Sequence, residues 1–357
     1  MTAGNQRPNV VVIGAGIVGA SIAYHLSTHA QVTIIDKGQP GLGVTSRAFG
    51  WLNTTAPQPP EFAGLRGLAI AEYHRLQHEL GTALINWTGA LSFSETPSPT
   101  DGVELIGPAR VQQLEPHFKA PMQQALFAPQ EGSIDPVAMT RLLLERAQAN
   151  GARLLTDTPV QAIECRDGAV ETLVTAGGRI TCECLVVAAG TECKALLQPL
   201  GVTLPLHPSP SILLRLRAQG QLVHTLIASD ELEIRQPTPE LILAAEDYLD
   251  ADGEDGPEAI ALRALNTIRK RLHGGQGLEL LSTEVGLRPM PDDRIPIIGT
   301  LPSVSGLYLA VMHSGVTLAA VIGRLVAQEL IEGKLATELQ GCRPTRFSGQ
   351  TPPATNC

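Results

Sequence analysis

The sequence has no excess of basic charge and no long apolar run. Its 357 residues carry a net charge of −9, and the lysines and arginines are scattered, so we do not expect nucleic acid as a partner. The apolar stretch at 307–331 is interrupted by His313, Gly315, Arg324 and Gln328, and falls short of the roughly 18 apolar residues that a membrane span needs. No apolar segment precedes residue 10, so no secretory signal is expected.

Cysteine pairs and aromatic residues are also scarce. The six cysteines include no C-x-x-C pair and no spacing typical of metal ligands; they are Cys165, Cys182, Cys184, Cys193, Cys342 and Cys357. We therefore predict reduced thiols, a cytoplasmic protein and no metal site. Aromatic side chains make up 3% of the chain, which leaves few of them to line a pocket.

A glycine-rich turn near the N-terminus predicts a nucleotide-binding site. Residues 10–13 form a short β-branched run, typical of a buried parallel strand, and Gly14, Gly16 and Gly19 follow with G-x-G-x-x-G spacing. The first glycine permits a sharp turn, the second lets the backbone approach a pyrophosphate, and the third lets helix and strand pack closely. The helix predicted over 17–28 directs its N-terminal amides at that pyrophosphate.

The second predicted strand, residues 32–35, is followed by an acidic residue, Asp36. It stands about 20 residues after the glycine turn, the spacing that dinucleotide-binding motifs show. A carboxylate here accepts hydrogen bonds from a ribose diol and repels a 2′-phosphate. NADP is therefore not expected, whereas NAD and a flavin dinucleotide both fit.

Helix-rich and strand-rich blocks alternate along the rest of the chain. We predict helices over 61–81, from Asp135 to Gly151, and up to about residue 273, with sheet in much of 205–285. Such a pattern suits one large domain or two interleaved domains. The tail from residue 341 is rich in proline, threonine and serine and is expected to be disordered.

Three later stretches, together with the glycine turn, resemble one family. They are GVTSRAFGWLN (43–53), VVAAGTE (186–192), and GLRPMPDDRIPIIG (286–299) followed by LYLAVMHSGVTLAA (307–320). Their order resembles the D-amino acid oxidase superfamily of FAD-dependent enzymes, particularly its glycine oxidase-like and sarcosine oxidase-like members. The resemblance runs from residue 10 to about 332 and implies FAD as the cofactor. A flavoprotein reductase would carry two G-x-G-x-x-G turns, whereas this sequence has a single one.

The resemblance implies an α/β fold with two domains. A Rossmann-like FAD-binding domain on a parallel sheet corresponds to residues 1–80, 137–204 and 287–340. An inserted, mainly antiparallel sheet that binds the substrate corresponds to residues 81–136 and 205–286, and residues 341–357 remain as the tail.

The family's FAD-binding positions transfer to this sequence motif by motif. The glycine turn and the second strand supply Gly14, Gly16, Ile17, Val18, Gly19, Asp36 and Lys37. The next loop supplies Thr45, Ser46 and Arg47, with the phosphates and the ribityl chain passing Ser46 and Arg47, and then Phe49, Gly50 and Trp51 near the flavin. Val160 corresponds to the adenine position, Gly190 to the pyrophosphate, and the pyrimidine end of the flavin meets His313, Ser314, Gly315, Val316 and Thr317. The dipole of the helix that begins there favours the reduced, negatively charged flavin.

The resemblance also indicates substrate-binding residues. Arg288 matches the family's G-L-R-P arginine, whose guanidinium pairs with the carboxylate of an amino acid. His313 has two interpretations, either a cation that meets the substrate or a histidine packed in its turn. The aromatic candidates for the pocket are Trp51, Trp87 and Tyr248.

The implied reaction is oxidation of the C–N bond of a small amino acid or secondary amine. A hydride passes from the α-carbon to flavin N5, and water hydrolyses the resulting imine. FAD supplies this chemistry, so no catalytic side chain is required.

The electrons then leave for oxygen, a quinone or a protein acceptor. Sarcosine oxidase-like members use a substrate-domain lysine for the reaction with oxygen, but no lysine lies here between Lys194 and Lys270. They also attach FAD through a cysteine in the block that matches 284–299, which contains none here, so we expect non-covalent FAD. The alternative is a flavin subunit of a heteromeric amino-acid dehydrogenase that passes electrons to a partner protein or quinone. The sequence also leaves a homo-oligomer open.

Overall fold

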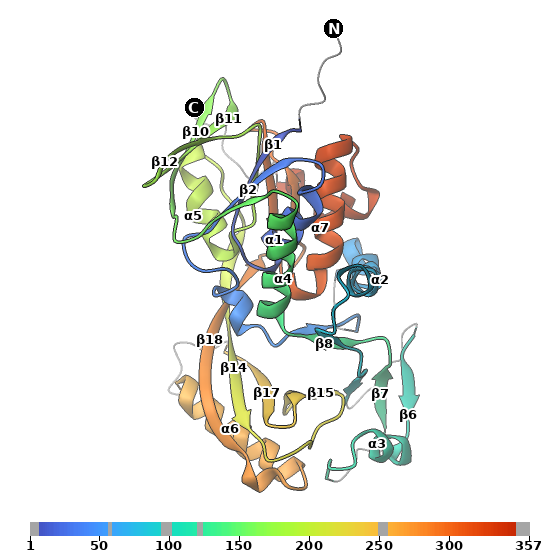
Figure 1. The fold of residues 1–357 in the computed structure, drawn as a ribbon. Helices are drawn as coiled ribbons and strands as arrows, with labels where there is room; N and C mark the ends of the chain where they lie inside the picture. Colours follow the sequence, from blue (N-terminus) through green and yellow to red (C-terminus); the bar gives the residue numbers. More distant parts are fainter. Residues whose placement is uncertain (1–6, 56–58, 94–101, 120–123, 249–255, 348–357) are drawn as a thin grey trace.

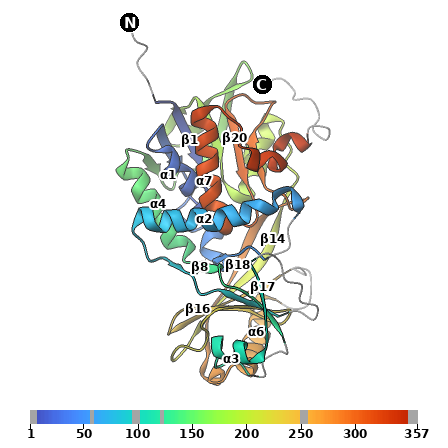
Figure 2. The same ribbon diagram turned by 90° about the vertical axis from the view of Figure 1, so that its right-hand side faces the viewer.

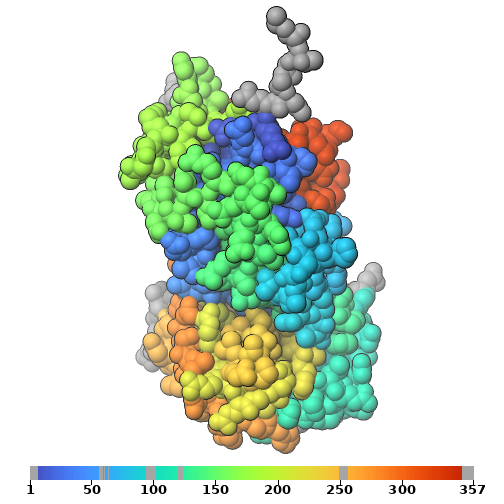
Figure 3. Space-filling model, viewed as in Figure 1, coloured from blue at the N-terminus to red at the C-terminus, as the bar shows by residue number. Residues whose placement is uncertain are grey.

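Two lobes stacked end to end make up the molecule (Figure 1). The structure, a computed structural model, describes residues 7–55, 59–93, 102–119, 124–248 and 256–347. The blue N-terminal and red C-terminal segments lie in the upper lobe, and the yellow and orange segments reach into the lower one (Figures 1 and 2). The space-filling view shows the same division of the surface (Figure 3).

A six-stranded sheet forms the centre of the upper lobe, with strand order β19-β20-β13-β1-β2-β9. Its strands are β1 (Asn9–Ile13), β2 (Gln31–Ile35), β9 (Arg153–Leu155), β13 (Cys184–Val187), β19 (Ile297–Thr300) and β20 (Leu307–Val311). All neighbours are parallel except β19 and β20. Val10 and Val12 belong to the apolar cluster on one face, and Val11 and Ile13 to that on the other. Because both faces are covered, the strand is a continuous apolar run.

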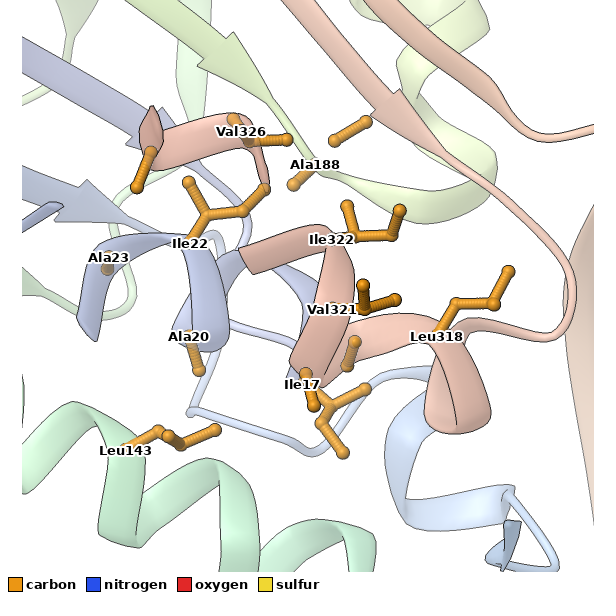
Figure 4. Packing of buried hydrophobic residues seen from close by; sticks show 14 of the residues in the cluster. Ile17, Ala20, Ile22, Ala23, Leu143, Ala188, Leu318, Val321, Ile322 and Val326 are labelled. Atoms are coloured by element: carbon orange, nitrogen blue, oxygen red, sulfur yellow. The ribbon is translucent and has the colours of Figure 1, made fainter. Parts of the chain in front are cut away.

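Helices α1 (Ile17–Leu26), α4 (Pro136–Ala149) and α7 (Gly315–Glu332) cover one face of this sheet. Figure 4 shows their shared apolar side chains, which include Ile17 and Ile22 of α1, Leu143 of α4, and Leu318 and Ile322 of α7. α1 and α7 cross closely at Gly323, where a Cβ would lie 2.1 Å from Ser21 Oγ. Any larger residue at Gly323 would push the two helices apart.

The other face of the parallel sheet is covered by a short helix and a small antiparallel sheet. These elements are α5 (Cys193–Leu197), β10 (Val160–Arg166), β11 (Ala169–Thr175) and β12 (Gly178–Thr181). Helix α2 (Ala63–Leu80) packs against α7 in the upper lobe.

An eight-stranded sheet forms the lower lobe, with strand order β18-β14-β17-β16-β15-β5-β7-β6. Its strands are β5 (Ala90–Ser92), β6 (Glu104–Ile106), β7 (Ala125–Ala128), β14 (Leu206–Arg217), β15 (Leu226–Ala228), β16 (Glu233–Thr238), β17 (Leu241–Asp247) and β18 (Glu279–Pro291). Its neighbours are antiparallel except β15 and β5. Helix α6 (Pro257–Arg271) packs on one face of this sheet, through alternate residues such as Ile212, Leu214 and Ile242. The opposite face of the sheet borders the space between the two lobes.

The remaining elements are short. They are β3 (Trp51–Leu52), β4 (Ile85–Asn86) and β8 (Gly132–Ile134), which form a sheet of their own, and helix α3 (Pro108–Leu114) in the lower lobe.

The predicted fold class, a parallel α/β domain with an antiparallel sheet inserted, is confirmed. The helix predicted over 61–81 is α2, which ends at Leu80 before Gly81 in the left-handed conformation (φ 60°). Asp135 caps α4 by accepting hydrogen bonds from the amides of Val137 and Ala138. All six strands of the parallel sheet fall within the segments assigned to FAD binding, although the domain boundaries themselves remain a prediction.

Two findings concern membranes and metals. None of the described helices is both long and apolar enough to span a bilayer. In the same part of the chain, no three His, Cys, Asp or Glu residues are grouped so that they could hold a metal ion.

The tail differs from the expectation. The predicted disorder from residue 341 is wrong for residues 341–347. In this segment the 3-10 helix η6 (Thr337–Cys342) ends and a second one, η7 (Pro344–Phe347), follows. Cys342 is buried in the core, and Arg346 binds Asp293 with a Nε–Oδ2 distance of 2.8 Å. Residues 348–357 lie outside the described part of the chain.

Glu329 of α7 is the anchor of this tail. Its carboxylate is buried and accepts hydrogen bonds from Tyr308 Oη (2.6 Å), Arg343 Nη1 (2.8 Å) and the Ala336 amide (2.7 Å). Burial alone would raise the pKa of Glu329, but these hydrogen bonds, above all that of Arg343, outweigh it and hold the pKa below its usual value.

We expect Glu329→Gln to destabilise the protein by about 3 kcal/mol at pH 7, because the partly buried Arg343 loses its buried counter-charge. Urea unfolding measures the loss, with Glu332→Gln, an exposed position on the same helix, as the matched control. Because the folded pKa is depressed, the contribution is complete above the unfolded pKa of 4.5 and disappears as the pH falls through the folded value. Equal stability of both variants at pH 7 would show that the Glu329 pair does not hold the tail.

Candidate active site

A continuous cavity of about 1760 Å³ separates the parallel sheet from the free face of the antiparallel sheet. Pockets for a single small molecule usually measure about 300–1,000 Å³, so this one has room for a dinucleotide together with a substrate. Its upper wall consists of the turns that follow β1, β13 and β20, at the carboxyl edge of the sheet. Ligands of open α/β sheets bind at that edge.

The glycine turn after β1 lies at one end of the cavity. Gly14 has a φ of 106°, and a Cβ there would lie 2.5 Å from the Ala188 carbonyl oxygen, so only glycine fits. Gly16 is the N-cap of α1, and the next amide, that of Ile17, donates to Thr45 Oγ1 at 3.2 Å. The N-terminus of α1 and the Thr45 hydroxyl therefore converge on the place where a pyrophosphate would bind.

Asp36 is fixed at the end of β2. Its Oδ2 accepts from the Ala15 amide at 2.6 Å and its Oδ1 from the Gly38 amide at 2.9 Å. Each carboxylate oxygen retains a lone pair, so Asp36 can still accept hydrogen bonds from a ribose diol. Val160 and Gly190 line the same end of the cavity.

Helix α7 begins at the other end of the upper wall of the cavity. Ser314 is its N-cap, and Gly315, Val316 and Thr317 line the cavity with first-turn amides that have no acceptor within the helix. Thr317 Oγ1 donates to the Trp51 carbonyl at 3.0 Å, which ties the start of α7 to strand β3.

His313 precedes this helix and lines the cavity. Burial, with the positive charges of Arg288 and Arg66 beside it, lowers the pKa of His313 to about 4. The ring is therefore neutral at pH 7, which does not support the interpretation of His313 as a cation that meets the substrate.

The loop before β3 is held from two sides. Arg235 of β16 donates from Nε to the Phe49 carbonyl at 2.6 Å, and the Trp51 indole donates to Glu131 Oε2 at 2.8 Å. Gly50 lies between them with φ 84°, and a Cβ there would be 2.3 Å from a backbone oxygen. This loop is fixed against the lower lobe.

Arg288 lies on the lower wall of the cavity. It is on β18 opposite Ser209 of β14, and its Nη2 donates to Ser209 Oγ at 2.9 Å. Its Nη1 is 2.8 Å from Asp247 Oδ1. These contacts fix the guanidinium group while part of it faces the cavity.

Glu233 of β16 is a second charged group on this wall. It pairs with Ala245, two residues before Asp247, so the Glu233 and Asp247 side chains share one face of the sheet. Burial, reinforced by the charges of Asp247 and Glu246, raises the pKa of Glu233 to about 7. One face of the sheet thus presents an arginine and a carboxylate to the cavity.

Most FAD-binding residues predicted from the sequence line the cavity, although contact with FAD itself remains a prediction. They are Gly14, Gly16, Ile17, Val18, Asp36, Lys37, Thr45, Arg47, Phe49, Gly50, Trp51, Val160, Gly190, His313, Ser314, Gly315, Val316 and Thr317. Gly19 and Ser46 do not line it. A Cβ at Gly19 would be 1.9 Å from the Gly14 oxygen, so Gly19 serves helix packing. The Ser46 hydroxyl donates to the Gly43 carbonyl of its own turn at 2.9 Å.

Of the three aromatic candidates, Trp51 alone lines the cavity. Tyr248 follows Asp247 and, because side chains alternate along a strand, packs against the apolar cluster on the opposite face. Trp87 stacks on His74 with ring centroids 3.9 Å apart. The prediction of Tyr248 as a pocket residue is therefore wrong.

Several cavity residues escaped sequence reasoning. They are Asn53, Arg66, Ser209, Glu233 and Asp247. Asn53 is the last residue of the 43–53 motif, and the other four lie outside the motifs. Arg66 falls on the apolar stripe of α2 that includes Leu65, Ala69 and Tyr73, three of the most buried residues of that helix. A charge at such a position is the one signal that the sequence offered.

The glycine turn, the acid at the end of the second strand and the antiparallel sheet across the cavity are the features of a dinucleotide-binding protein with two lobes. The model of the family described as DAO, FAD dependent oxidoreductase, matches residues 9–329. The chain belongs to this family, as the sequence motifs predict, and is FAD-dependent.

Known proteins of similar sequence and structure share nearly the whole chain. It is 28% identical to a glycine oxidase of Bacillus licheniformis over 93% of this chain and 95% of that protein. A D-amino acid dehydrogenase of Rhizobium johnstonii is 23% identical over 95% and 99% of the two chains. The crystal structure of a glycine oxidase from Bacillus cereus superposes with a TM-score of 0.81 at 23% identity, over 93% of this chain and 97% of that one.

The residues present fit FAD. The tight turn at Gly14, the open amides of α7 and the carboxylate of Asp36 lie along one cavity. Its upper wall offers helix N-termini to a pyrophosphate and to the flavin, and the antiparallel sheet closes the other side.

Asp36→Ala is expected to weaken FAD binding by about 1.5–3 kcal/mol, because charge-assisted hydrogen bonds to the ribose are lost. Titration of the apoprotein with FAD measures this. The control is Asp157→Asn, near the same sheet edge but outside the cavity, where asparagine tolerates the positive φ of 49°. If both variants bound FAD like the wild type, Asp36 would not be the ribose ligand.

Proposed function

We propose that the protein oxidises the C–N bond of a small amino acid or secondary amine that carries a carboxylate. The observation that carries this proposal is the pair of opposite charges, Arg288 and Glu233, on the sheet face that looks across the cavity at the FAD-binding turns. An amino acid has one group of each sign, and a guanidinium fork is suited to a carboxylate.

The side chains of the lower wall bind and orient the substrate. Arg288, held by Asp247 and Ser209, receives the carboxylate. Glu233 accepts a hydrogen bond from the substrate nitrogen, and its pKa of about 7 lets the carboxylate take up the proton that an ammonium group must lose before oxidation. Bound FAD supplies the acceptor for the two electrons.

The electron acceptor is proposed to be oxygen, a quinone or a partner protein. Among the described residues, the lysine that lines the cavity is Lys37, at the Asp36 end. The substrate wall thus lacks the lysine that the resemblance assigns to sarcosine oxidase-like members, and one relative is named a dehydrogenase. These two observations favour the second candidate, a flavin subunit that needs a partner or quinone.

Anaerobic addition of amino acids to the purified chain separates the two candidates. Flavin reduction by the chain alone supports an independent enzyme, and the rate of reoxidation by air or by a soluble quinone then identifies the acceptor. A flavin that is reduced only after a partner chain is added supports the heteromeric dehydrogenase. Cytoplasmic location and oligomeric state remain predictions.

We expect the purified protein to be yellow and acid precipitation to release the flavin into the supernatant, since 284–299 contains no cysteine for covalent attachment. Absorbance at visible wavelengths in pellet and supernatant measures the partition. Colour retained by the washed pellet contradicts non-covalent binding.

Arg288→Ala is expected to weaken apparent affinity for the amino acid about 10- to 100-fold, because a charge-assisted pair worth about 1.5–3 kcal/mol is lost. Arg288→Lys keeps the charge but loses the fork, so its loss is smaller. Anaerobic flavin reduction at increasing substrate concentration measures both. Arg217→Ala, an exposed arginine of the same sheet that pairs with Glu279, is the control.

Asp247→Asn distinguishes substrate binding from a purely structural ion pair. Without Asp247 the guanidinium of Arg288 is still present and less neutralised, so affinity for a carboxylate substrate is retained or increased. If Asp247→Asn lowered affinity as much as Arg288→Ala, the ion pair and not carboxylate binding would account for Arg288.

A further inference from the structure

Arg66 of α2 is a buried cation. It is 4% exposed, on the apolar face of its helix, and it lines the cavity. Burying a guanidinium group is costly unless a negative charge compensates for it. The position therefore raises the question of which anion Arg66 meets.

The partners of Arg66 within the protein are neutral. Its Nη1 donates to the backbone oxygen of Asn53 at 3.3 Å and to Asn53 Oδ1, and its Nη2 donates to Ser314 Oγ at 3.0 Å. Its Nε is buried and makes no hydrogen bond to any residue that the structure describes. The guanidinium thus retains a donor and its charge.

Glu131 is the carboxylate whose charge acts on Arg66, but its oxygens are already engaged. Burial lowers the pKa of Arg66 and Glu131 partly opposes this. Glu131 accepts hydrogen bonds from the Trp51 indole, from the Thr54 amide and hydroxyl, and from the Thr55 amide. Across the described ranges, no carboxylate lies within ion-pair distance of Arg66.

Arg66 stands at the N-terminus of α7. Ser314, whose hydroxyl accepts from Arg66, is the N-cap and makes no capping bond of its own to the helix. The first-turn amides that follow Ser314 line the same cavity. The side-chain charge and the positive end of an 18-residue helix therefore act at one place in the upper lobe.

We propose that Arg66 and the N-terminus of α7 form one anion site, which takes the negative charge that the pyrimidine edge of FAD acquires on reduction. When a C–H bond of the amine breaks, two electrons and one proton pass to the flavin, the amine becomes an imine, and the nitrogen proton goes to solvent. The flavin then carries one net negative charge, and Arg66 neutralises it. This inference rests on FAD binding, and it deepens the proposed function by naming a residue that makes FAD a better oxidant.

The test is the two-electron midpoint potential of FAD bound to the full chain, measured anaerobically against reference dyes. Arg66→Gln keeps an amide donor for Ser314 but removes the charge, and Arg66→Met removes both. We expect each to lower the stability of reduced relative to oxidised FAD at least tenfold, which for a two-electron couple is a fall of about 30 mV. Arg66→Lys restores most of the potential, because the charge returns.

Arg75→Met is the matched control, since it removes an arginine from the exposed side of the same helix. Its potential is expected to equal that of the wild type. Titration of the apoproteins adds a second readout, because the neutral variants should bind oxidised FAD like the wild type and reduced FAD at least tenfold more weakly. If Arg66→Met does not fold, Arg66→Gln decides.

An unchanged potential in a folded neutral variant overturns the proposal. If, in addition, the affinity for a carboxylate substrate falls in that variant, the anion is the substrate's carboxylate; if nothing changes, Arg66 is structural. The midpoint potential and the FAD titration, which decide the proposal, use no amine, so their outcome is independent of whether the protein oxidises the amino acids proposed above.

Discussion

The parallel alignment of β1, β13 and β20 is the constraint on which the site depends. Because parallel strands end at the same edge, the turns after these strands meet there, and α1 and α7 both begin at that edge. Two positive helix ends therefore open on one cavity, where the motifs predict the pyrophosphate and the flavin. The close packing of α1 on α7 at Gly323 fixes the angle between them.

The antiparallel sheet completes the site because the side chains along each strand alternate between its two faces. One set of residues on β14, β16 and β17 packs on α6, and the other set faces the cavity with charged and polar groups. The long strands β14 and β18, of 12 and 13 residues, run as a pair along the orange and yellow edge of Figure 1 and carry Ser209 and Arg288. A single register thus separates core from site, because a shift of one residue would exchange the two faces.

Local motifs predicted most of the residues that line the upper wall of the cavity. The glycine turn, Asp36 and the start of α7 depend on residues that are neighbours in sequence, and their conformations require particular residues such as Gly14 with φ 106°. Arg288 was found through its motif. Its partner Asp247 was not, because that contact depends on how β14 pairs with β17 and β18.

The remaining errors have a common cause in long-range packing. Tyr248 was assigned to the pocket because the sequence does not tell which face of the sheet its side chain lies on; that depends on how the strands pair. The tail was expected to be disordered because its composition is polar, yet Arg343 meets a buried carboxylate on α7. Arg66 was overlooked although the 3.6-residue period of α2 places it among buried residues.

Anaerobic bleaching of the bound flavin by a panel of amino acids, N-methyl amino acids and the matching amines without a carboxylate tests the central claim most directly. The account predicts that at least one compound with both an amine and a carboxylate reduces the flavin and yields one oxo acid per FAD, whereas its decarboxylated analogue reacts far more slowly. The contradicting result would come from protein that contains a full complement of FAD. Its flavin would stay oxidised with every such compound, whether the chain is alone or mixed with an extract that contains partner proteins, and would be reduced by NADH or by a hydroxy acid.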